Sequence, residues 1–198
     1  MTVALIDTGC ANIFSVQAAL DRMGVGHTLA AMPGEADKSE RLILPGVGAA
    51  GPAMARLNAS GWADALHTET RPLMGICLGM QLLFERSAEG DVETLGLIPG
   101  EVKVMQAPSD GVLPHMGWNQ LAIDREDPLL SGIEPGAYVY FVHGYAAPVG
   151  EHTLASCDYG GNFSATIRSG NVMGCQFHPE RSAVPGAQIL KNFLELTA

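Results

Sequence analysis

The stretch Pro72-Leu-Met-Gly-Ile-Cys-Leu-Gly-Met-Gln-Leu-Leu-Phe84 carries the strongest structural signal in the chain. It predicts a buried strand over Leu73–Ile76, a sharp turn with a glycine on each side of Cys77, and an apolar helix over Leu78–Phe84. Glycine is needed at such a corner because a Cβ atom would clash where the backbone doubles back. This is the thiol counterpart of the serine nucleophile elbow. The helix N-terminus favours a thiolate, so Cys77 is a candidate nucleophile; a structural cysteine between small residues is the alternative.

Strands and helices alternate through the first half of the chain. The apolar runs that read as strands are Val3–Asp7, His27–Ala30, Arg41–Leu44 and Leu73–Ile76. Apolar residues at helical spacing begin at Ile13, Gly24 is placed to end that helix, and a second helix is expected over Pro52–Ser60. This alternation predicts a parallel sheet that helices cover on both faces.

The second half changes to short β-rich runs separated by turns. These runs are Val102–Met105, Asn119–Ile123, Tyr138–Val142, Thr153–Cys157, Phe163–Ile167 and Val172–Cys175. We expect them to form an antiparallel extension of the sheet, followed by an amphipathic helix through Ile189–Leu194. The predicted fold class is therefore α/β, an open mixed sheet that is mostly parallel, in a single domain over residues 1–198.

The composition limits the class of protein. The chain is 47% hydrophobic and 16% charged, which argues against disorder, and no apolar run approaches the roughly 20 residues of a membrane span. A net charge of −10 argues against a nucleic-acid partner. The N-terminus lacks a basic segment before its first apolar run, so we expect no signal peptide and a cytoplasmic protein.

A second motif, His178-Pro-Glu180, follows a short apolar strand. A thiol nucleophile needs a base to take its proton, and the base needs an acidic neighbour to fix its tautomer. His178 and Glu180 supply both, and Pro179 favours an extended backbone at His178. A surface turn with incidental polar residues is the alternative.

A third motif, Pro45-Gly-Val-Gly48, lies where the third strand ends. Sites in open α/β sheets form at the carboxyl ends of strands, and glycines let backbone N–H groups approach a ligand or a peptide flip. The loop is a candidate oxyanion site, with an ordinary strand-to-helix connection as the alternative.

No metal or cofactor site is expected. The four cysteines Cys10, Cys77, Cys157 and Cys175 lack metal-ligand spacing and read as free thiols. For His115, His143 and His152, whose spacing favours no shared ion, we expect loop or packing roles. Trp62 is expected in the core, and Trp118 is a candidate interface anchor.

Together, Cys77-Leu-Gly-Met-Gln81, His178-Pro-Glu180 and Pro45-Gly-Val-Gly48 resemble the class I (triad) glutamine amidotransferases over nearly the whole chain. Pro114-His-Met-Gly-Trp-Asn119 and Tyr140-Phe-Val-His-Gly-Tyr145 are similar to the glutaminase subunits of imidazole glycerol phosphate synthases, which act in histidine biosynthesis.

The resemblance implies a role for each matching residue. Cys77 attacks the side-chain amide carbon of glutamine, His178 acts as base and then as acid for the leaving ammonia, and Glu180 orients His178. The implied oxyanion donors are the N–H of Leu78 and a peptide N–H of the loop Gly46, Val47 and Gly48. The residues implied to hold glutamine are Gly48, Gln81, Glu89, Gly144 and Tyr145.

The resemblance also implies a partner. Ammonia would pass to a (β/α)8 cyclase/synthase subunit in a heterodimer, and the partner-facing residues would be Met116, Trp118, Asn119 and Tyr138. The chain departs from the family pattern at Thr8, usually aromatic; at Ala11, usually glycine; at Val112, often basic; and at Gly144, often Ser or Thr.

Three other functions remain open at this point. The chain is alternatively the glutaminase subunit of another triad amidotransferase, a stand-alone γ-glutamyl amide hydrolase, or a non-catalytic binding module on the same scaffold. Activity in isolation separates the stand-alone hydrolase, because a subunit that wastes no glutamine needs low basal activity. The Pro45–Gly48 loop, which would flip to complete the oxyanion site, is a natural gate for that purpose.

Overall fold

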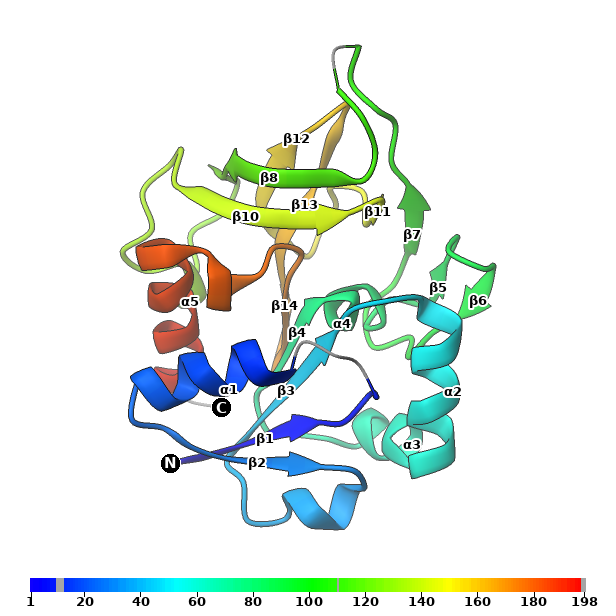
Figure 1. The fold of residues 1–198 in the computed structure, drawn as a ribbon, viewed down its shortest axis with the longest axis vertical. Coiled ribbons are helices and arrows are strands. Elements are labelled where there is room, and N and C mark those ends of the chain that lie inside the picture. Colours follow the sequence, from blue (N-terminus) through cyan, green and yellow to red (C-terminus); the bar gives the residue numbers. More distant parts are fainter. Residues whose placement is uncertain (10–12, 110, 197–198) are drawn as a thin grey trace.

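The computed structural model describes residues 1–9, 13–109 and 111–196 (Figure 1), so the expectations for Cys10 and Ala11 lie outside the described residues. The helices are α1 Ile13–Arg22, α2 Ala50–Ser60, α3 Trp62–His67, α4 Leu78–Gln81 and α5 Ala183–Glu195, with 3-10 turns η1 Pro33–Ala36, η2 Pro128–Leu130 and η3 Pro179–Arg181. The strands are β1 Thr2–Ile6, β2 Gly26–Ala30, β3 Arg41–Gly46, β4 Leu73–Cys77, β5 Arg86–Ser87, β6 Val92–Glu93, β7 Glu101–Val104, β8 His115–Gln120, β9 Ala122–Ile123, β10 Tyr138–His143, β11 Tyr145–Ala146, β12 Thr153–Asp158, β13 Asn162–Ser169 and β14 Val172–Cys175.

One eight-stranded sheet runs through the molecule in the order β2-β1-β3-β4-β14-β13-β12-β9. The strands from β2 to β14 pair in parallel, and β13, β12 and β9 extend the sheet antiparallel. The predicted mixed sheet, mostly parallel with an antiparallel extension, is confirmed. β14, expected within the extension, is instead the last parallel strand and lies beside β4.

Two of the six runs in the second half do not join this sheet, so the expectation of one continuous extension is wrong for them. A third run, Asn119–Ile123, joins it only through β9, because Asn119 and Gln120 lie in β8. Val102–Met105 contributes β7 to a small sheet of order β11-β7-β5-β6, and Tyr138–Val142 forms β10, which pairs only with β8 among the described strands. The β10 side chains Val139 and Phe141 are fully buried, whereas Tyr138 is exposed. The β8–β10 ribbon therefore packs an apolar face onto the core instead of adding to a sheet edge.

Helices cover both faces of the central sheet, as predicted. On one face, Val16 of α1 and Phe193 of α5 join a core that also includes Phe141 of β10. On the other face, Leu57 of α2 and Trp62 of α3 pack with α4. Figure 1 places α1 and α5 on one side of the sheet and α2 and α3 on the other. Trp62 is 1% exposed and its Nε1 donates to the Ala30 carbonyl, so the expected core role is confirmed.

The helix after Cys77 is shorter than predicted: α4 ends at Gln81 rather than Phe84. The carbonyls of Leu82, Leu83 and Phe84 accept hydrogen bonds from the N–H groups of Leu95, Ile98 and Gly96. The last carbonyls of any helix lack partners inside it, so these bonds are compatible with a helix that ends at Phe84. What ends α4 earlier is a tighter turn, in which the N–H groups of Leu83 and Phe84 donate to the carbonyls of Met80 and Gln81, three residues back instead of four. The predicted end of α1 is confirmed, because Gly24 adopts the left-handed φ of +69° that glycine tolerates.

Candidate active site

The β4–α4 corner holds Cys77 in a rare backbone conformation. Its φ of 53° and ψ of −111° lie where a residue with a Cβ atom is strained. The surrounding backbone segments approach so closely that only glycine fits. A Cβ atom would lie 1.8 Å from the Leu44 carbonyl oxygen at Gly79, 2.6 Å from Gly79 backbone atoms at Gly75, and 2.7 Å from the Gly79 nitrogen at Gly46. The predicted clash with the doubled-back chain is confirmed at Gly75, whereas at Gly79 the atom that excludes a Cβ belongs to β3. For Gly46 no such clash was predicted.

The three described cysteines are free and differ in surroundings. Burial raises the pKa of Cys157 to about 12 and also raises the pKa of Cys175, which has no exposed surface. Both therefore stay protonated at neutral pH. Cys77 is the only described cysteine that lines the cavity presented below.

His178 and Glu180 lie behind the sulfur of Cys77. His178 Nδ1 is 2.9 Å from Glu180 Oε1, and the His178 side chain is hydrogen-bonded to Cys77. The Glu180 side chain is fully buried and that of His178 is 3% exposed. Burial lowers the pKa of His178, but the hydrogen bonds and charges of Cys77 and Glu180 outweigh it and raise the pKa to about 10. The arrangement can therefore take a proton from the thiol and hold the resulting imidazolium.

A cavity of about 200 Å³ opens above this cluster. Its lining residues are Val47, Gly48, Cys77, Leu78, Gln81, Glu89, Val142, His143, Gly144, Tyr145 and His178. The structure thus brings the predicted glutamine and oxyanion residues together around Cys77, apart from Gly46, which ends β3 directly beside Cys77. Their roles in binding remain predictions.

The Pro45–Gly48 loop is tied down near both ends. Thr8 Oγ1 donates to the Pro45 carbonyl over 3.2 Å, and Glu89 Oε2 accepts from the N–H of Ala50, the first residue of α2, over 2.9 Å. Between these anchors, Gly48 has a φ of +98°, and a Cβ atom there would meet nothing within 4 Å. A hydroxyl thus stands at Thr8, where the family pattern has an aromatic ring, and it supports the loop.

Three residues of the site were not predicted from the sequence. Val142 and His143 line the cavity, and Gln176 lies beneath it with no exposed surface. Gln176 Nε2 is 3.8 Å from Cys77 Sγ, and its Oε1 accepts from Gln81 Nε2 over 3.0 Å. A signal was available, because residues two apart in an extended segment share a face and Gln176 precedes His178 by two.

The packing role expected for His115 and His143 is confirmed. His115 Nδ1 is 3.3 Å from His143 Nε2, and the His115 ring stacks on those of Phe141 and Tyr159. Burial lowers the pKa of both histidines to about 4, so both are neutral at pH 7.

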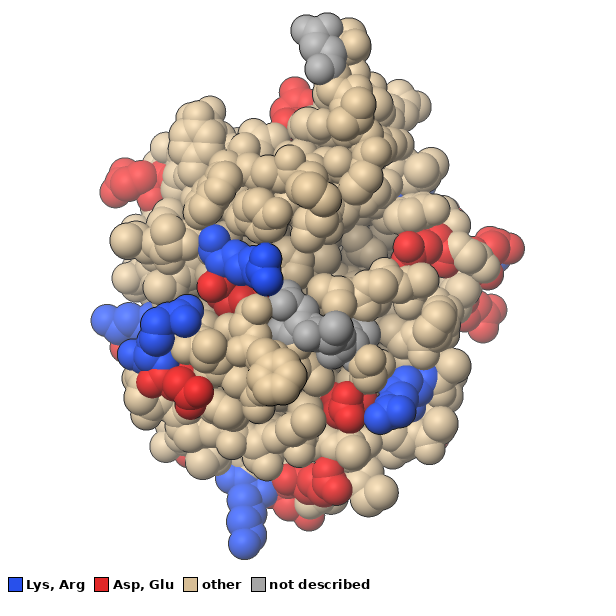
Figure 2. All heavy atoms as spheres, viewed as in Figure 1, with Lys and Arg blue, Asp and Glu red and all other residues tan. Residues whose placement is uncertain are grey.

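The predicted partner-facing residues lie on the β8–β10 ribbon. Met116, Trp118 and Tyr138 are 64%, 51% and 54% exposed. Figure 2 shows that the middle of this face, over β8 and β10, carries few charged side chains. Asn119 differs from them, because its amide turns inward and donates to the Asp158 carbonyl over 2.9 Å. Val112, where the family pattern is often basic, is 75% exposed.

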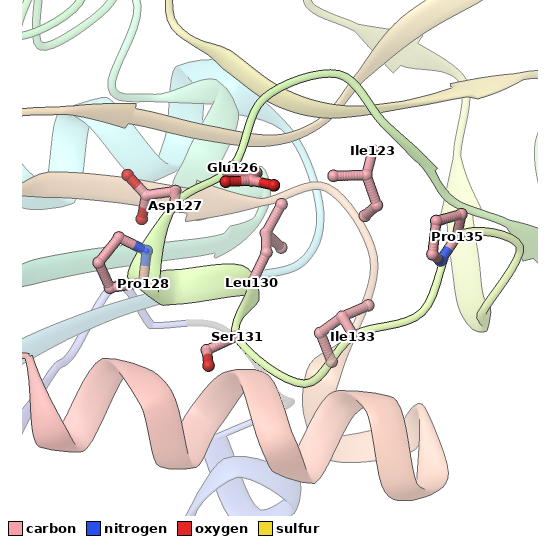
Figure 3. Close-up of a pocket in the computed structure, with 8 residues that line it drawn as sticks. All are labelled: Ile123, Glu126, Asp127, Pro128, Leu130, Ser131, Ile133 and Pro135. Atoms are coloured by element: carbon pink, nitrogen blue, oxygen red, sulfur yellow. The ribbon is translucent and has the colours of Figure 1, made fainter.

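A wider cavity of about 530 Å³ lies away from this site, along the segment between β9 and β10 (Figure 3). It is lined by Ile123, Glu126, Asp127, Pro128, Leu130, Ser131, Ile133 and Pro135. Asp127 is paired with Arg168 over 3.0 Å. Its lining lacks a thiol and an imidazole, so the smaller cavity at Cys77 is the candidate active site.

Known proteins resemble the chain along its whole length. The model of the family "Glutamine amidotransferase class-I" matches residues 4–196. The imidazole glycerol phosphate synthase subunit HisH of Xanthomonas axonopodis pv. citri is 56% identical over 196 residues, and that of Vibrio cholerae is 48% identical over 200 residues, with 98% of each chain covered in both.

Solved structures agree on the fold. PurLQS from Thermotoga maritima superposes with a TM-score of 0.73 at 22% identity, covering 98% of this chain and 97% of that one. A glutamine amidotransferase from the same organism gives a TM-score of 0.65 at 16% identity, covering 98% and 81%. The match to the family model and the near full-length identity to its members mean that this chain belongs to the class-I glutamine amidotransferase family.

Proposed function

We propose that this chain is the glutaminase subunit of an imidazole glycerol phosphate synthase and hydrolyses glutamine to glutamate and ammonia for histidine biosynthesis. The observation that carries the proposal is the strained Cys77 corner with the His178–Glu180 pair behind it, at one cavity. The full-length identity of 56% and 48% to two HisH subunits supports the choice of this member of the family.

In the first half of the reaction, Cys77 Sγ attacks the side-chain amide carbon of glutamine. His178 Nδ1 is held by Glu180, so Nε2 takes the thiol proton. Collapse of the tetrahedral intermediate breaks the C–N bond, and His178 returns the proton to the departing ammonia. A γ-glutamyl thioester remains on Cys77.

Water completes the cycle. It attacks the thioester carbon while His178 takes one of its protons. The C–S bond then breaks, His178 returns that proton to Cys77 Sγ, and glutamate leaves. The negative oxygen formed in each half would lie between the N–H of Leu78, at the start of α4, and a peptide N–H of the Gly46–Gly48 loop. Gln81, Glu89 and the backbone of Gly144 and Tyr145 hold the amino-acid end of glutamine within the cavity.

The ammonia goes to a (β/α)8 cyclase/synthase subunit that binds the β8–β10 ribbon in a heterodimer. The exposed apolar side chains of Met116, Trp118 and Tyr138 and the scarcity of charge around them suit a protein interface. Asn119 would support this face without contacting the partner through its amide, because the amide donates to the Asp158 carbonyl within the chain.

A matched pair of variants tests this interface. Met116→Ala removes a methionine that is 64% exposed on the proposed face, and Met32→Ala removes one that is 55% exposed beside η1. We expect Met116→Ala to weaken binding of the synthase partner about 10-fold, measured by titration calorimetry, and Met32→Ala to leave it unchanged. Equal effects would place the partner elsewhere.

We further propose that residues 1–198 act as one domain in the cytoplasm. Both ends of the described chain contribute to one sheet, since β1 and β14 are separated in it only by β3 and β4. Among the described residues, no helix is long and apolar enough to cross a membrane.

The decisive assay is glutamate release from glutamine, with and without the ligand-bound synthase partner. The proposal predicts low activity in isolation, strong stimulation by the complex, and loss of activity in Cys77→Ala. Full activity of the isolated chain would instead favour a stand-alone γ-glutamyl amide hydrolase.

A further inference from the structure

Gln176 joins the nucleophile to the wall of the substrate cavity. It follows β14 directly, and its side chain is fully buried between Cys77 and Gln81. We propose that Gln176 is a positioning residue of the glutaminase site, holding the sulfur of Cys77 and the amide of Gln81 in register. The inference rests on the proposed function, because it takes Cys77 as the nucleophile and Gln81 as a glutamine ligand.

The orientation of both amides follows from one carbonyl. A backbone carbonyl only accepts hydrogen bonds, so the Gln81 atom 2.8 Å from the Tyr145 oxygen is its Nε2. The same Nε2 lies 3.0 Å from the Gln176 amide, which therefore turns its oxygen toward Gln81. The Gln176 NH₂ group is then left to face Cys77 Sγ at 3.8 Å. The hydrogen-bond network thus fixes which end of each amide is nitrogen.

The Tyr145 carbonyl is itself held from a second side. His143 Nδ1 is 2.9 Å from it, so His143 carries its proton on Nδ1 and accepts on Nε2 from His115. With two donors, the carbonyl has both lone pairs in use. The Tyr145 carbonyl, from which the orientation of the two amides follows, is therefore held by hydrogen bonds on two sides. Both N–H groups of Gln81 are directed into the protein.

Two consequences follow for the reaction. An N–H group directed at Cys77 Sγ stabilises sulfur more as the negative thiolate than as the thiol. With both Gln81 N–H groups bonded inside the protein, Gln81 Oε1 is the atom left to accept from the substrate. Gln176 therefore acts on the nucleophile through its nitrogen and on substrate binding through its oxygen.

Two substitutions separate these actions. Gln176→Glu keeps an oxygen for Gln81 but puts an acceptor, not a donor, against the sulfur. Gln176→Met has similar length and removes both groups. In the complex with the synthase partner, we expect Gln176→Glu to lower kcat for glutamine about 10- to 100-fold with KM nearly unchanged. We expect Gln176→Met to lower kcat similarly and also to raise KM.

The pH dependence of alkylation gives a readout that a space-filling role would not move. Iodoacetamide alkylates Cys77 on the isolated chain, and peptide mass spectrometry gives the rate at each pH. In both variants the curve of rate against pH should shift to higher pH by about one unit. Gln188→Met is the matched control: the Gln188 amide bonds to Asn192 within α5, and its kinetics should equal those of the wild type.

Wild-type kinetics in Gln176→Met would overturn the proposal, as would an unshifted alkylation profile in a folded Gln176→Glu. Thermal unfolding identifies a variant that has lost its fold, and the other variant then decides. Failure of the proposed function is a separate result, seen as turnover by Cys77→Ala whatever Gln176 does.

Discussion

Two parts of the active-site lining are built in different ways. Around Cys77, backbone segments of β3, β4 and α4 touch through glycines, and a Cβ atom at Gly79 would lie 1.8 Å from a carbonyl oxygen. At Gly48 and Gly144, which also line the cavity, a Cβ atom would meet nothing within 4 Å. We call these the packed wall and the open wall.

The packed wall holds the nucleophile in place, whereas the open wall leaves room for the loop or the substrate to move. A nucleophile gains from a fixed position, because its alignment need not be recovered at each turnover. The open wall has room for a peptide to turn or for a substrate to settle, which is what a gate that responds to a partner needs. If the two walls differ in this way, substitutions on the packed wall should lower stability and kcat strongly, and substitutions on the open wall should have small effects on substrate binding.

The largest effect is expected on the packed wall. Gly79→Ala forces a Cβ atom into the Leu44 carbonyl, so the free energy of unfolding should fall by about 3 kcal/mol or more, measured by urea denaturation. The control is Gly144→Ala on the open wall, where the new Cβ has room and the backbone lies outside the left-handed region. Equal stability of the two variants would contradict the distinction between the walls.

Glu180→Gln tests how the packed wall supports its base. The substitution keeps the shape of the side chain but removes the charge that holds His178 Nδ1. Glutaminase kcat in the complex should fall about 10³- to 10⁴-fold with little change in KM. An activity within 10-fold of the wild type would remove Glu180 from the mechanism.

The same variant should change how stability depends on pH. The pKa of His178 is raised above 6.5 in the folded state, with Cys77 and Glu180 holding the imidazolium. A raised pKa contributes stability that is fully present below pH 6.5 and is lost as the pH rises toward about 10. The difference in unfolding free energy between wild type and Glu180→Gln should therefore be large at pH 6 and shrink by pH 10. A constant difference would show that the charge pair does not set it.

The smallest effect is expected on the open wall. Gly144→Ser places a hydroxyl at the cavity, at a position where the family pattern often has Ser or Thr. One added hydrogen bond to glutamine should lower KM about 2- to 5-fold and leave kcat unchanged, measured by steady-state glutamate release. An increase in KM would mean that the open wall has no space to spare.

The packed wall was predictable from sequence and much of its surroundings was not. Cys77 with its flanking glycines and the His178-Pro-Glu180 loop are local motifs that can be recognised from residue types and spacing, although the atom that excludes a Cβ at Gly79 is the Leu44 carbonyl oxygen of β3. The spacing of Gln176 from His178 places it on the same face, but its role depends on Gln81 and on a carbonyl of β11, which only tertiary packing brings to it.

The β8–β10 ribbon shows a second limit. Alternating polar and apolar residues predict a strand but do not say which sheet it joins, and the buried Val139 and Phe141 decided that through the core. The end of α4 was also misplaced. The N–H groups of Leu83 and Phe84 donate three residues back instead of four, and the apolar run Leu78–Phe84 does not distinguish such a turn from an α-helix.

The central claim is that Cys77 carries the γ-glutamyl group. The complex with the synthase partner, mixed with glutamine and quenched in acid during turnover, should give a γ-glutamyl adduct on the peptide that contains Cys77, detected by mass spectrometry. Cys77→Ala should show neither the adduct nor glutamate release. Turnover by Cys77→Ala, or an adduct on the buried Cys157 or Cys175, would contradict the account.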